Sequence, residues 1–341
     1  MFRLLNMKLN INIILLSCIC VIANTKSITT SLDGPNTKQV GDLIAIGDIH
    51  GSIDNLRKTL YYNKIIDEND NWIAGNRTVV QTGDLIGRGL NDKQVLEYIY
   101  NIQKDASKHG GEWVQLLGNH EWMELHHNYN YAVDSPGVGF GSLNYRINEL
   151  HHGKLGQWLR TLPIIYKWND VIFVHGGFTS EYLSKFTPEQ INQHIIQYFK
   201  GYHSDTSVAD SLLWDRQLAE YPEHMICNKL DTVLYNLNSN TMVVGHTITS
   251  TIGFTPGEIG SKCMDKLKLI DVGISDFFRD IPKRWRALHM YDKSWDLKME
   301  EEAMMDAINS PRIGVNGQNR SEYKPRDSNG KGRKDYIGYI L

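Results

Sequence analysis

The sequence predicts an α/β fold built on a buried mixed or parallel sheet. From residue 42 onward, short apolar segments alternate with segments of helical spacing, and this alternation is typical of strands buried between helices. Polar residues flanked by glycine follow several of the apolar segments directly, which is where α/β sheets place their binding groups. Neither an internal repeat nor a convincing linker interrupts the pattern, so we expect one domain over residues 40–300.

The predicted elements follow one another in a regular order. Strands are expected at the short apolar runs, which are residues 43–46, 78–81, 113–117, 171–174, 242–244, 267–270 and 287–291. Helices are expected where apolar residues recur three and four positions apart, at residues 54–62, 92–103 and 188–199. Residues 122–162 are rich in His, Tyr, Asn and Gly, and we expect them to form helices and loops over the mouth of a site.

Composition excludes some classes of protein. The 341 residues are 41% apolar, which is enough for a sizeable core, although length alone does not choose between one large domain and two smaller ones. The formal net charge is -3, so the chain has no global basic footprint and no nucleic-acid partner is expected.

The N-terminus has the features of a secretory signal. Arg3 and Lys8 give a basic start, residues 11–23 are almost wholly apolar, and polar residues 24–31 follow. We therefore expect residues 1–23 to be a signal peptide that delivers the chain to the secretory pathway, either secreted or membrane-associated. An uncleaved signal anchor is the alternative and would hold the protein on a membrane. At the other end, residues 307–341 are polar and are expected to form a loosely held tail.

The cysteines leave two alternatives open. Cys18 and Cys20 lie in the signal segment, so only Cys227 and Cys263 remain in the rest of the chain. These two form one disulfide if the compartment is oxidising, and otherwise they are two free thiols.

Five short polar motifs share one placement, just past the end of a short apolar run and beside glycine. The motifs are Asp48 with His50, Asp84, Asn119 with His120, His175, and His246. Any one of them alone is usually a turn or a hydrogen-bonding residue. Together they offer carboxylate, imidazole and amide groups at the ends of successive strands, and these are the ligands that hard and borderline cations prefer. The set therefore predicts a metal site.

These motifs also carry a family resemblance. GDIHG, GDLIGRG, GNHE, HGG and GHT, in that order, resemble the signature of the phosphoprotein phosphatases within the calcineurin-like metallophosphoesterases, over residues 42–274. LLWDR at residues 212–216 and DVGIS at residues 271–275 are similar to the Shewanella-like branch of that superfamily. The resemblance implies two packed mixed β-sheets flanked by helices (α/β/β/α). It also implies a phosphatase acting on phosphorylated proteins or small phosphoesters.

The resemblance assigns metal ligands to the chain. Asp48 and His50 would bind a first divalent ion, and Asp84 would bridge it to a second. Asn119, His175 and His246 would hold the second ion. In such a centre a metal-bridging hydroxide attacks the phosphorus directly. Manganese, iron and zinc all suit these ligands, so the identity of the two ions stays open.

Three further residues receive roles from the same resemblance. Arg88 and Arg216 would grip the phosphoryl oxygens, a task that suits the guanidinium fork. His120 would donate a proton to the leaving alkoxide.

One position departs from the family pattern. The second motif usually reads GDxxDRG, but Gly87 stands here in place of the second Asp, whose carboxylate orients the histidine of GNHE. Asp92 is a candidate replacement, because it lies close in sequence. Otherwise His120 works without support, in which case Gly87→Asp should raise turnover on alkyl phosphates. A third reading is that the protein binds metal and phosphate without useful turnover.

Two other functions therefore stay in view beside the phosphatase. A dinucleoside-polyphosphate hydrolase uses the same kind of metal centre, although the WDR segment at residues 214–216 and the length of the second half favour a phosphatase. A catalytically weak phosphate-binding protein is suggested by Gly87 alone.

Overall fold

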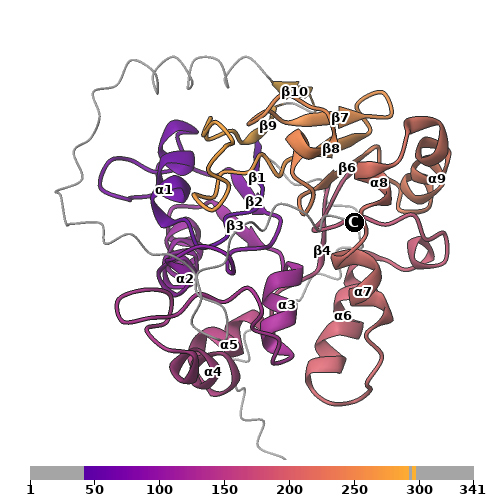
Figure 1. Cartoon of the computed structure of the whole chain (residues 1–341). Helices are drawn as coiled ribbons and strands as arrows, with labels where there is room; N and C mark the ends of the chain where they lie inside the picture. Colours follow the sequence, from indigo (N-terminus) through magenta and orange to yellow (C-terminus); the bar gives the residue numbers. More distant parts are fainter. Residues whose placement is uncertain (1–41, 292–293, 297–341) are drawn as a thin grey trace, which may run out of the picture. The chain divides into compact units, whose positions relative to one another are not determined.

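The computed structural model describes residues 42–291 and 294–296 (Figure 1). The expected signal segment at residues 1–23 and most of the expected tail, which begins at residue 307, therefore lie outside the described residues. Among the helices that are described, none is both long enough and apolar enough to cross a membrane.

The first sheet has three parallel strands, β1, β2 and β3, extended at one edge by two antiparallel strands. Its strand order is β10-β9-β1-β2-β3. The strands are β1 (Leu43–Ile46), β2 (Thr78–Gln81), β3 (Glu112–Gln115), β9 (Leu288–Tyr291) and β10 (Ser294–Asp296).

The second sheet repeats this plan with an antiparallel strand at each edge. Strands β5, β6 and β8 are parallel, and the order is β4-β5-β6-β8-β7. The strands are β4 (Ile165–Trp168), β5 (Val171–Val174), β6 (Thr241–Val244), β7 (Gly260–Lys262) and β8 (Leu267–Leu269).

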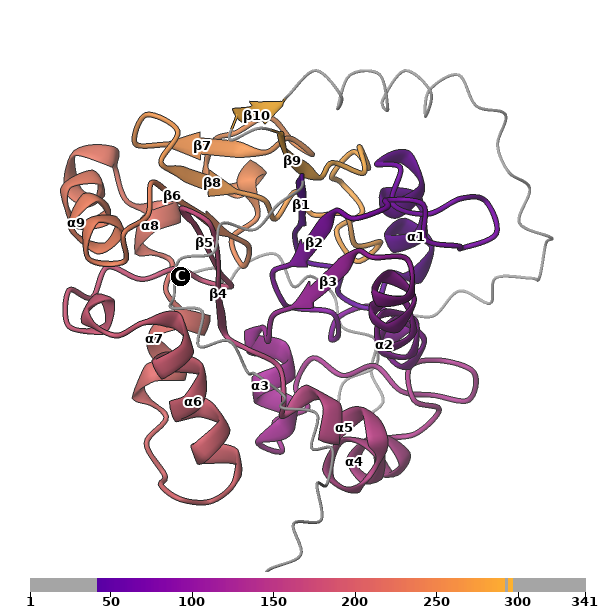
Figure 2. The same cartoon turned by 180° about the vertical axis from the view of Figure 1, so that it is seen from behind.

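Helices lie outside the two sheets and around the loops that follow the strands. The α-helices are α1 (Ile53–Tyr62), α2 (Asp92–Lys108), α3 (Asn119–Leu125), α4 (Leu143–His152), α5 (Lys154–Leu159), α6 (Pro188–Phe199), α7 (Ser207–Leu213), α8 (Gln217–Glu220) and α9 (Glu223–Asn236). Two short 3-10 helices are η1 (Leu183–Lys185) and η2 (Thr249–Ile252). Helices α1 and α2 flank the first sheet, and α8 and α9 flank the second (Figure 2).

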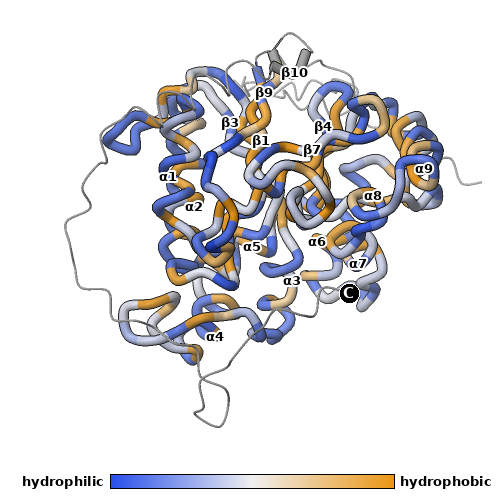
Figure 3. Tube along the Cα trace, turned by 45° about the horizontal axis from the view of Figure 1, so that its top comes forward, coloured by the Kyte–Doolittle hydropathy of each residue, from blue (hydrophilic) through white to orange (hydrophobic). Residues whose placement is uncertain are grey.

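The two sheets pack face to face. Successive side chains of a strand point to opposite faces of its sheet, and so they enter two different apolar layers. Leu43 and Ala45 of β1 point into a core shared with Phe173 of the second sheet. Ile44 and Ile46 point the other way, into the layer covered by helices. Every residue of β1 is therefore buried, which explains why the strand reads as a continuous apolar run. In Figure 3 the hydrophobic colour gathers on the central strands, while many loop segments are hydrophilic.

The structure confirms the expected fold class of two packed mixed sheets flanked by helices. Three of the strands were not expected from the sequence, namely β4, β7 and β10, and all three are antiparallel edge strands. The helix expected at residues 92–103 continues to Lys108, and α7 and α9 were also not anticipated.

Cys227 of α9 and Cys263, which follows β7, form a disulfide with Cα atoms 5.4 Å apart. The sequence left a disulfide and two free thiols as alternatives, and the structure contains the disulfide. The bond ties α9 to the antiparallel edge of the second sheet.

Candidate metal centre

The polar motifs meet because the carboxyl ends of the parallel strands do. Asp48 and His50 follow β1, Asp84 follows β2, and Asn119 begins α3 after β3. From the second sheet, His175 and His246 follow β5 and β6. All six of these side chains are buried, and they come from segments up to 198 residues apart in the chain.

The backbone at this edge is bent sharply. His50, Asp84, Arg88 and His246 have φ values of 44°, 56°, 72° and 64°, in the left-handed region that residues other than glycine seldom occupy. Each such residue costs about 1 kcal/mol or more and persists only where the surroundings impose it. Four such residues in one cluster indicate that the fold accepts backbone strain at this edge of the sheets in order to orient the side chains.

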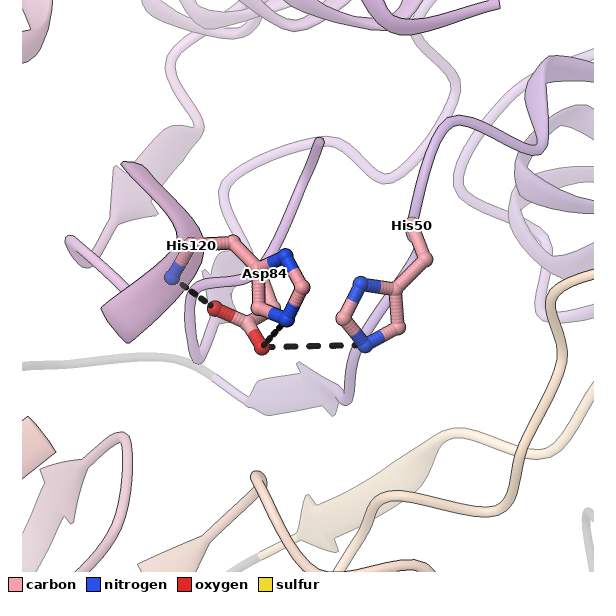
Figure 4. A group of neighbouring side chains, drawn as sticks. All are labelled: His50, Asp84 and His120. Atoms are coloured by element: carbon pink, nitrogen blue, oxygen red, sulfur yellow. Dashed lines mark hydrogen bonds and ion pairs between the residues drawn. The ribbon is translucent and has the colours of Figure 1, made fainter. Parts of the chain in front are cut away.

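Asp84 lies at the centre of the cluster. Its Oδ2 lies 3.6 Å from Nε2 of His50 and 3.9 Å from Nε2 of His120, and both rings point at the carboxylate (Figure 4). On the other side, its Oδ1 lies 3.3 Å from Nε2 of His175. One carboxylate thus faces imidazoles with both of its oxygens.

The hydrogen bonds of two imidazoles favour a cation. Nδ1 of His175 lies 2.9 Å from the carbonyl oxygen of Thr82, and Nδ1 of His50 lies 3.2 Å from that of Ile86. Because a carbonyl oxygen only accepts, each Nδ1 carries a proton, and in the neutral ring Nε2 turns its lone pair toward Asp84. Acceptors that face one another in this way, oriented by backbone carbonyls, are the arrangement of metal-ligating histidines.

Asn119 completes a second group of ligands. One of its amide atoms lies 2.8 Å from Nε2 of His175, 3.0 Å from Nδ1 of His246 and 3.1 Å from Oδ2 of Asp84. If this atom is the amide oxygen, it adds an acceptor to a group of acceptors, and a cation would stabilise the group. If it is the amide nitrogen, it donates hydrogen bonds to these neighbours. Nε2 of His246 is buried and has no hydrogen-bond partner among the residues that the structure describes. The donor set therefore fits a metal on each side of Asp84.

Burial and mutual repulsion set the protonation of these groups. Burial lowers the pKa of His50 to about 4 and holds the pKa values of His120 and His246 well below their usual range. Burial works the other way on Asp84, but His175, His120 and His50 outweigh it and keep its pKa well below the usual value. The carboxylate of Asp84 is thus ionised and the imidazoles of His50 and His246 are neutral at pH 7, which is the state in which these groups bind metal.

Asp48, one of the expected ligands, and Asp271 bring two further carboxyl groups to the cluster. Both oxygens of Asp48 accept a hydrogen bond from the backbone N–H of His246, at 3.2 and 3.1 Å. Burial first, and then the charges of Asp271 and Asp84, raise the pKa of Asp48 well above its usual range. Burial likewise raises the pKa of Asp271 to about 6. Three carboxylates this close together are stabilised by cations bound among them.

The two arginines lie near this cluster without a carboxylate partner among the described residues. The guanidinium of Arg88 lies 4.6 Å from the ring of Tyr131 and within 6.0 Å of the rings of Phe277 and Phe278, and its Nε is buried without a hydrogen bond. Nη1 of Arg216 donates to the carbonyl oxygen of His246 and to Oγ1 of Thr247, both at 3.0 Å.

Glu121 has a part that the sequence did not reveal. Its carboxylate accepts hydrogen bonds from four backbone N–H groups, at 2.7–3.1 Å. The donors are Gly118, Asp84, Leu85 and Ile86. Glu121 therefore ties the loop that carries Asp84 to the start of α3. An acidic residue three positions after a glycine that begins a helix is the only sequence signal for this role.

The structure answers the question raised by Gly87. Asp92 does not replace the missing carboxylate, because its Oδ2 accepts from Nη2 of Arg146 at 2.8 Å and from the N–H of Gly87 at 3.1 Å, and no bond joins it to His120 in the described part of the chain. Instead, the imidazole of His120 lies directly against Gly87: a Cβ at position 87 would be 2.2 Å from Nδ1 of His120.

Comparison with known proteins agrees with this geometry. The model of the calcineurin-like phosphoesterase family matches residues 42–250. Shewanella-like protein phosphatase 1 of Plasmodium berghei is 33% identical over 71% of this chain and 69% of its own length. A solved cold-active protein-tyrosine phosphatase of a psychrophilic Shewanella species is 27% identical, with a TM-score of 0.59 over 75% of this chain and 77% of its own.

A symmetrical bis(5'-nucleosyl)-tetraphosphatase of Proteus mirabilis also matches, at 29% identity, but over only 40% of this chain and 45% of its own length. The phosphatases therefore share far more of the chain than this nucleotide hydrolase does. The chain belongs to the calcineurin-like phosphoesterase family, in the branch of the Shewanella-like protein phosphatases, and is a metal-dependent hydrolase of phosphate monoesters.

Proposed function

We propose that this enzyme is a dinuclear-metal phosphatase that removes phosphate from phosphorylated proteins without a phosphoenzyme intermediate. The observation that carries the proposal is the position of Asp84. Its Oδ1 faces His175 at 3.3 Å, and its Oδ2 faces His50 at 3.6 Å. A carboxylate with imidazole lone pairs toward each oxygen is suited to bridge two cations.

Six side chains would hold the pair of ions. Asp48 and His50 would bind on one side of Asp84, and Asn119, His175 and His246 on the other. When bound, two such ions supply a hydroxide nucleophile at neutral pH and neutralise charge on the phosphoryl group.

The remaining roles belong to cationic and protic groups of the chain. Neither Arg88 nor Arg216 is neutralised by a carboxylate among the described residues, so both are available to a phosphate. His120 lies beside Asp84, with Nε2 toward it, and would protonate the departing oxygen.

Aromatic side chains around Arg88 support an aryl phosphate as substrate. Tyr131 and Phe277 flank its guanidinium and are partly exposed, so they offer apolar area to a ring attached to the phosphate. The structural relative from Shewanella is named a protein-tyrosine phosphatase. Phosphotyrosine in a protein is therefore the substrate we propose to test first.

The proposed function is tested by hydrolysis of p-nitrophenyl phosphate and of a phosphotyrosine peptide in the presence of manganese. Asp84→Asn should abolish turnover, while Asp54→Asn, at an exposed position in the first turn of α1, should leave it unchanged. Chelation should remove activity, and manganese, iron or zinc should restore it. Metal analysis would identify the ion that best occupies the site.

Two experimental outcomes would contradict the proposed phosphatase function and favour another function. Hydrolysis of diadenosine tetraphosphate without hydrolysis of phosphopeptides would make the enzyme a dinucleoside-polyphosphate hydrolase. Bound metal and measurable phosphate affinity without turnover on any of these substrates would make it a phosphate-binding protein.

We also propose that the enzyme enters the secretory pathway and is secreted or membrane-associated. The disulfide between Cys227 and Cys263 supports an oxidising compartment. N-terminal sequencing of the mature protein tests this proposal, because a chain that begins near Asn24 indicates a cleaved signal and an intact Met1 contradicts cleavage.

A further inference from the structure

His120 lacks the support that its proposed role requires. As described above, Gly87 offers no carboxylate and Asp92 is bonded elsewhere. The only charged partner of the ring among the described residues is Asp84, which faces Nε2 and belongs to the metal centre. A general acid must be held within hydrogen-bond reach of the group that it protonates, and loss of an orienting partner costs a histidine much of its effect.

Tyr131 contacts His120 where that support is missing. The two rings have centroids 4.8 Å apart and are inclined by 46°. The ring of His50 packs on His120 as well, with centroids 4.6 Å apart. His120 is thus enclosed by Tyr131, His50 and the backbone of Gly87, and the absence of a side chain at Gly87 gives it the room to lie there.

The same tyrosine holds Arg88. The guanidinium lies over the ring of Tyr131 at 4.6 Å, and the backbone N–H of Arg88 donates to the carbonyl oxygen of Tyr131 at 2.7 Å. The side chain of Tyr131 therefore contacts both the proposed proton donor and one of the proposed phosphate ligands.

A buried ionic cluster anchors the loop that carries Tyr131 and the loop that carries Gly87. Arg146 is fully buried and pairs with Asp134 at 2.8 Å, three residues beyond Tyr131. It also pairs with Asp92 at 2.8 Å, and Asp92 accepts the N–H of Gly87. Buried ion pairs and a hydrogen bond therefore hold both loops, and with them the contact between Tyr131 and the Gly87–Arg88 turn.

We propose that Tyr131 is the positioning residue of this active site: its ring orients His120 in place of a carboxylate, and it aligns Arg88 with the phosphate. This inference rests on the proposed function. An aromatic contact of this kind stabilises the ring less than a charge-assisted hydrogen bond does. It restricts the rotation of the imidazole but supplies no negative charge.

The proposal has a signature that general loss of structure would not produce. With His120 misplaced, substrates with poor leaving groups suffer most, because they depend on protonation in the transition state. We expect Tyr131→Ala to slow phenyl and alkyl phosphates by at least about tenfold, and p-nitrophenyl phosphate by less than about threefold. Release of Arg88 should weaken inorganic phosphate binding to the metal-loaded protein, measured by calorimetry, by about 2- to 30-fold.

Matched variants distinguish the contribution of the aromatic ring of Tyr131 from other effects of a substitution. Tyr145 is as exposed as Tyr131, at 43%, so Tyr145→Ala should leave the leaving-group dependence and the phosphate affinity unchanged. Tyr131→Phe keeps the ring and should behave as the native protein does. Tyr131→Leu keeps apolar volume without the ring, and should reproduce the alanine result even if that variant folds poorly.

Several results would overturn the proposal. Equal loss across all leaving groups, a phenylalanine variant as damaged as the alanine variant, or unchanged phosphate affinity in Tyr131→Ala would each do so. Absence of turnover in the native protein would instead contradict the proposed function. In that case the phosphate affinities of the same variants would still decide whether Tyr131 aligns Arg88.

Discussion

Gly87 and His120 compete for one volume, since a Cβ on Gly87 would lie 2.2 Å from Nδ1 and 3.0 Å from Cε1 of the imidazole. Gly87 also has a φ of 80°, which L side chains rarely adopt. An aspartate at this position would therefore strain the backbone and displace His120. The sequence alone suggested that Gly87→Asp would raise turnover on alkyl phosphates if His120 lacked support, and the geometry favours the opposite result.

We predict that Gly87→Asp lowers kcat by about tenfold or more on both aryl and alkyl phosphates, because a misplacement of about 1 Å in an active site can cost about 100-fold. Steady-state kinetics and metal content of the variant are the measurements. Gly137 is a matched control, since it has the same φ of 80° but no atom of the described residues lies within 4 Å of an added Cβ. Gly87→Ala should thus lose activity and Gly137→Ala should keep it. A Gly87→Asp enzyme faster than the native one would refute this reading.

Glu121 should matter for stability and for the position of Asp84. In Glu121→Gln the amide nitrogen would face backbone N–H groups that now donate to the carboxylate, and each donor left unsatisfied costs about 1–3 kcal/mol. We expect a melting temperature lower by roughly 5–10 °C and weaker metal binding. Calorimetry and metal titration would show both. Glu97→Gln, on the exposed face of α2, is the control, and an equal melting temperature in the two variants would contradict the role.

Some features of the fold were readable from the sequence because local signals determine them. The parallel strands β1, β2, β5 and β6 are buried on both faces, so they read as apolar runs. The edge strand β7 has only three residues and no such pattern. Helix α9 did carry a signal, with Ile226, Leu230 and Val233 at helical spacing, and it could have been identified.

The candidate site likewise contains residues that local sequence signals reveal and residues that they do not. The proposed ligand residues could be predicted because each belongs to a local motif beside glycine at the end of a strand. The residues around them were not identified, because their contacts join distant segments. Arg146 meets Asp92 across 54 positions, and Tyr131, in the loop after α3, meets Arg88, which precedes α2. Residue type does not distinguish such a tyrosine from the other tyrosines of the chain. Only the folded arrangement brings it to His120.

The disulfide should contribute to stability and not to the chemistry. Cys227 and Cys263 are 36 positions apart, and closing a loop of that size in the unfolded chain stabilises the fold by about 4 kcal/mol in the chain-entropy model. We expect reduction, or the Cys227→Ser/Cys263→Ser variant, to lower the melting temperature by roughly 8–16 °C. The kcat on p-nitrophenyl phosphate at 25 °C should not change. A fall in kcat without a fall in melting temperature would mean that the bond acts on the active site.

The Arg146 cluster should make stability depend on pH. Three carboxylates share one guanidinium: Asp92, Glu124 and Asp134 all pair with Arg146 at 2.8 Å. Burial raises the pKa of Glu124 to about 8 and that of Asp92 to about 6. The folded chain therefore binds more protons than the unfolded chain between the ordinary carboxyl pKa and these raised values. Stability from this source is full below about pH 4 and is lost as the pH rises through the raised pKa values, about 6 for Asp92 and about 8 for Glu124.

Glu124→Gln removes the negative charge that is hardest to bury while leaving an oxygen to accept from Arg146. Relative to the native protein, the variant should gain about 3–6 °C in melting temperature between pH 6 and pH 9, because it has no proton to lose over that interval. Calorimetry at several pH values, with metal present, measures the difference. Glu97→Gln, whose side chain is exposed, should follow the native curve at every pH. If Glu124→Gln also runs parallel to the native curve, or falls further below it at pH 9, then Glu124 stays ionised in the folded protein and the excess negative charge of the cluster is tolerated.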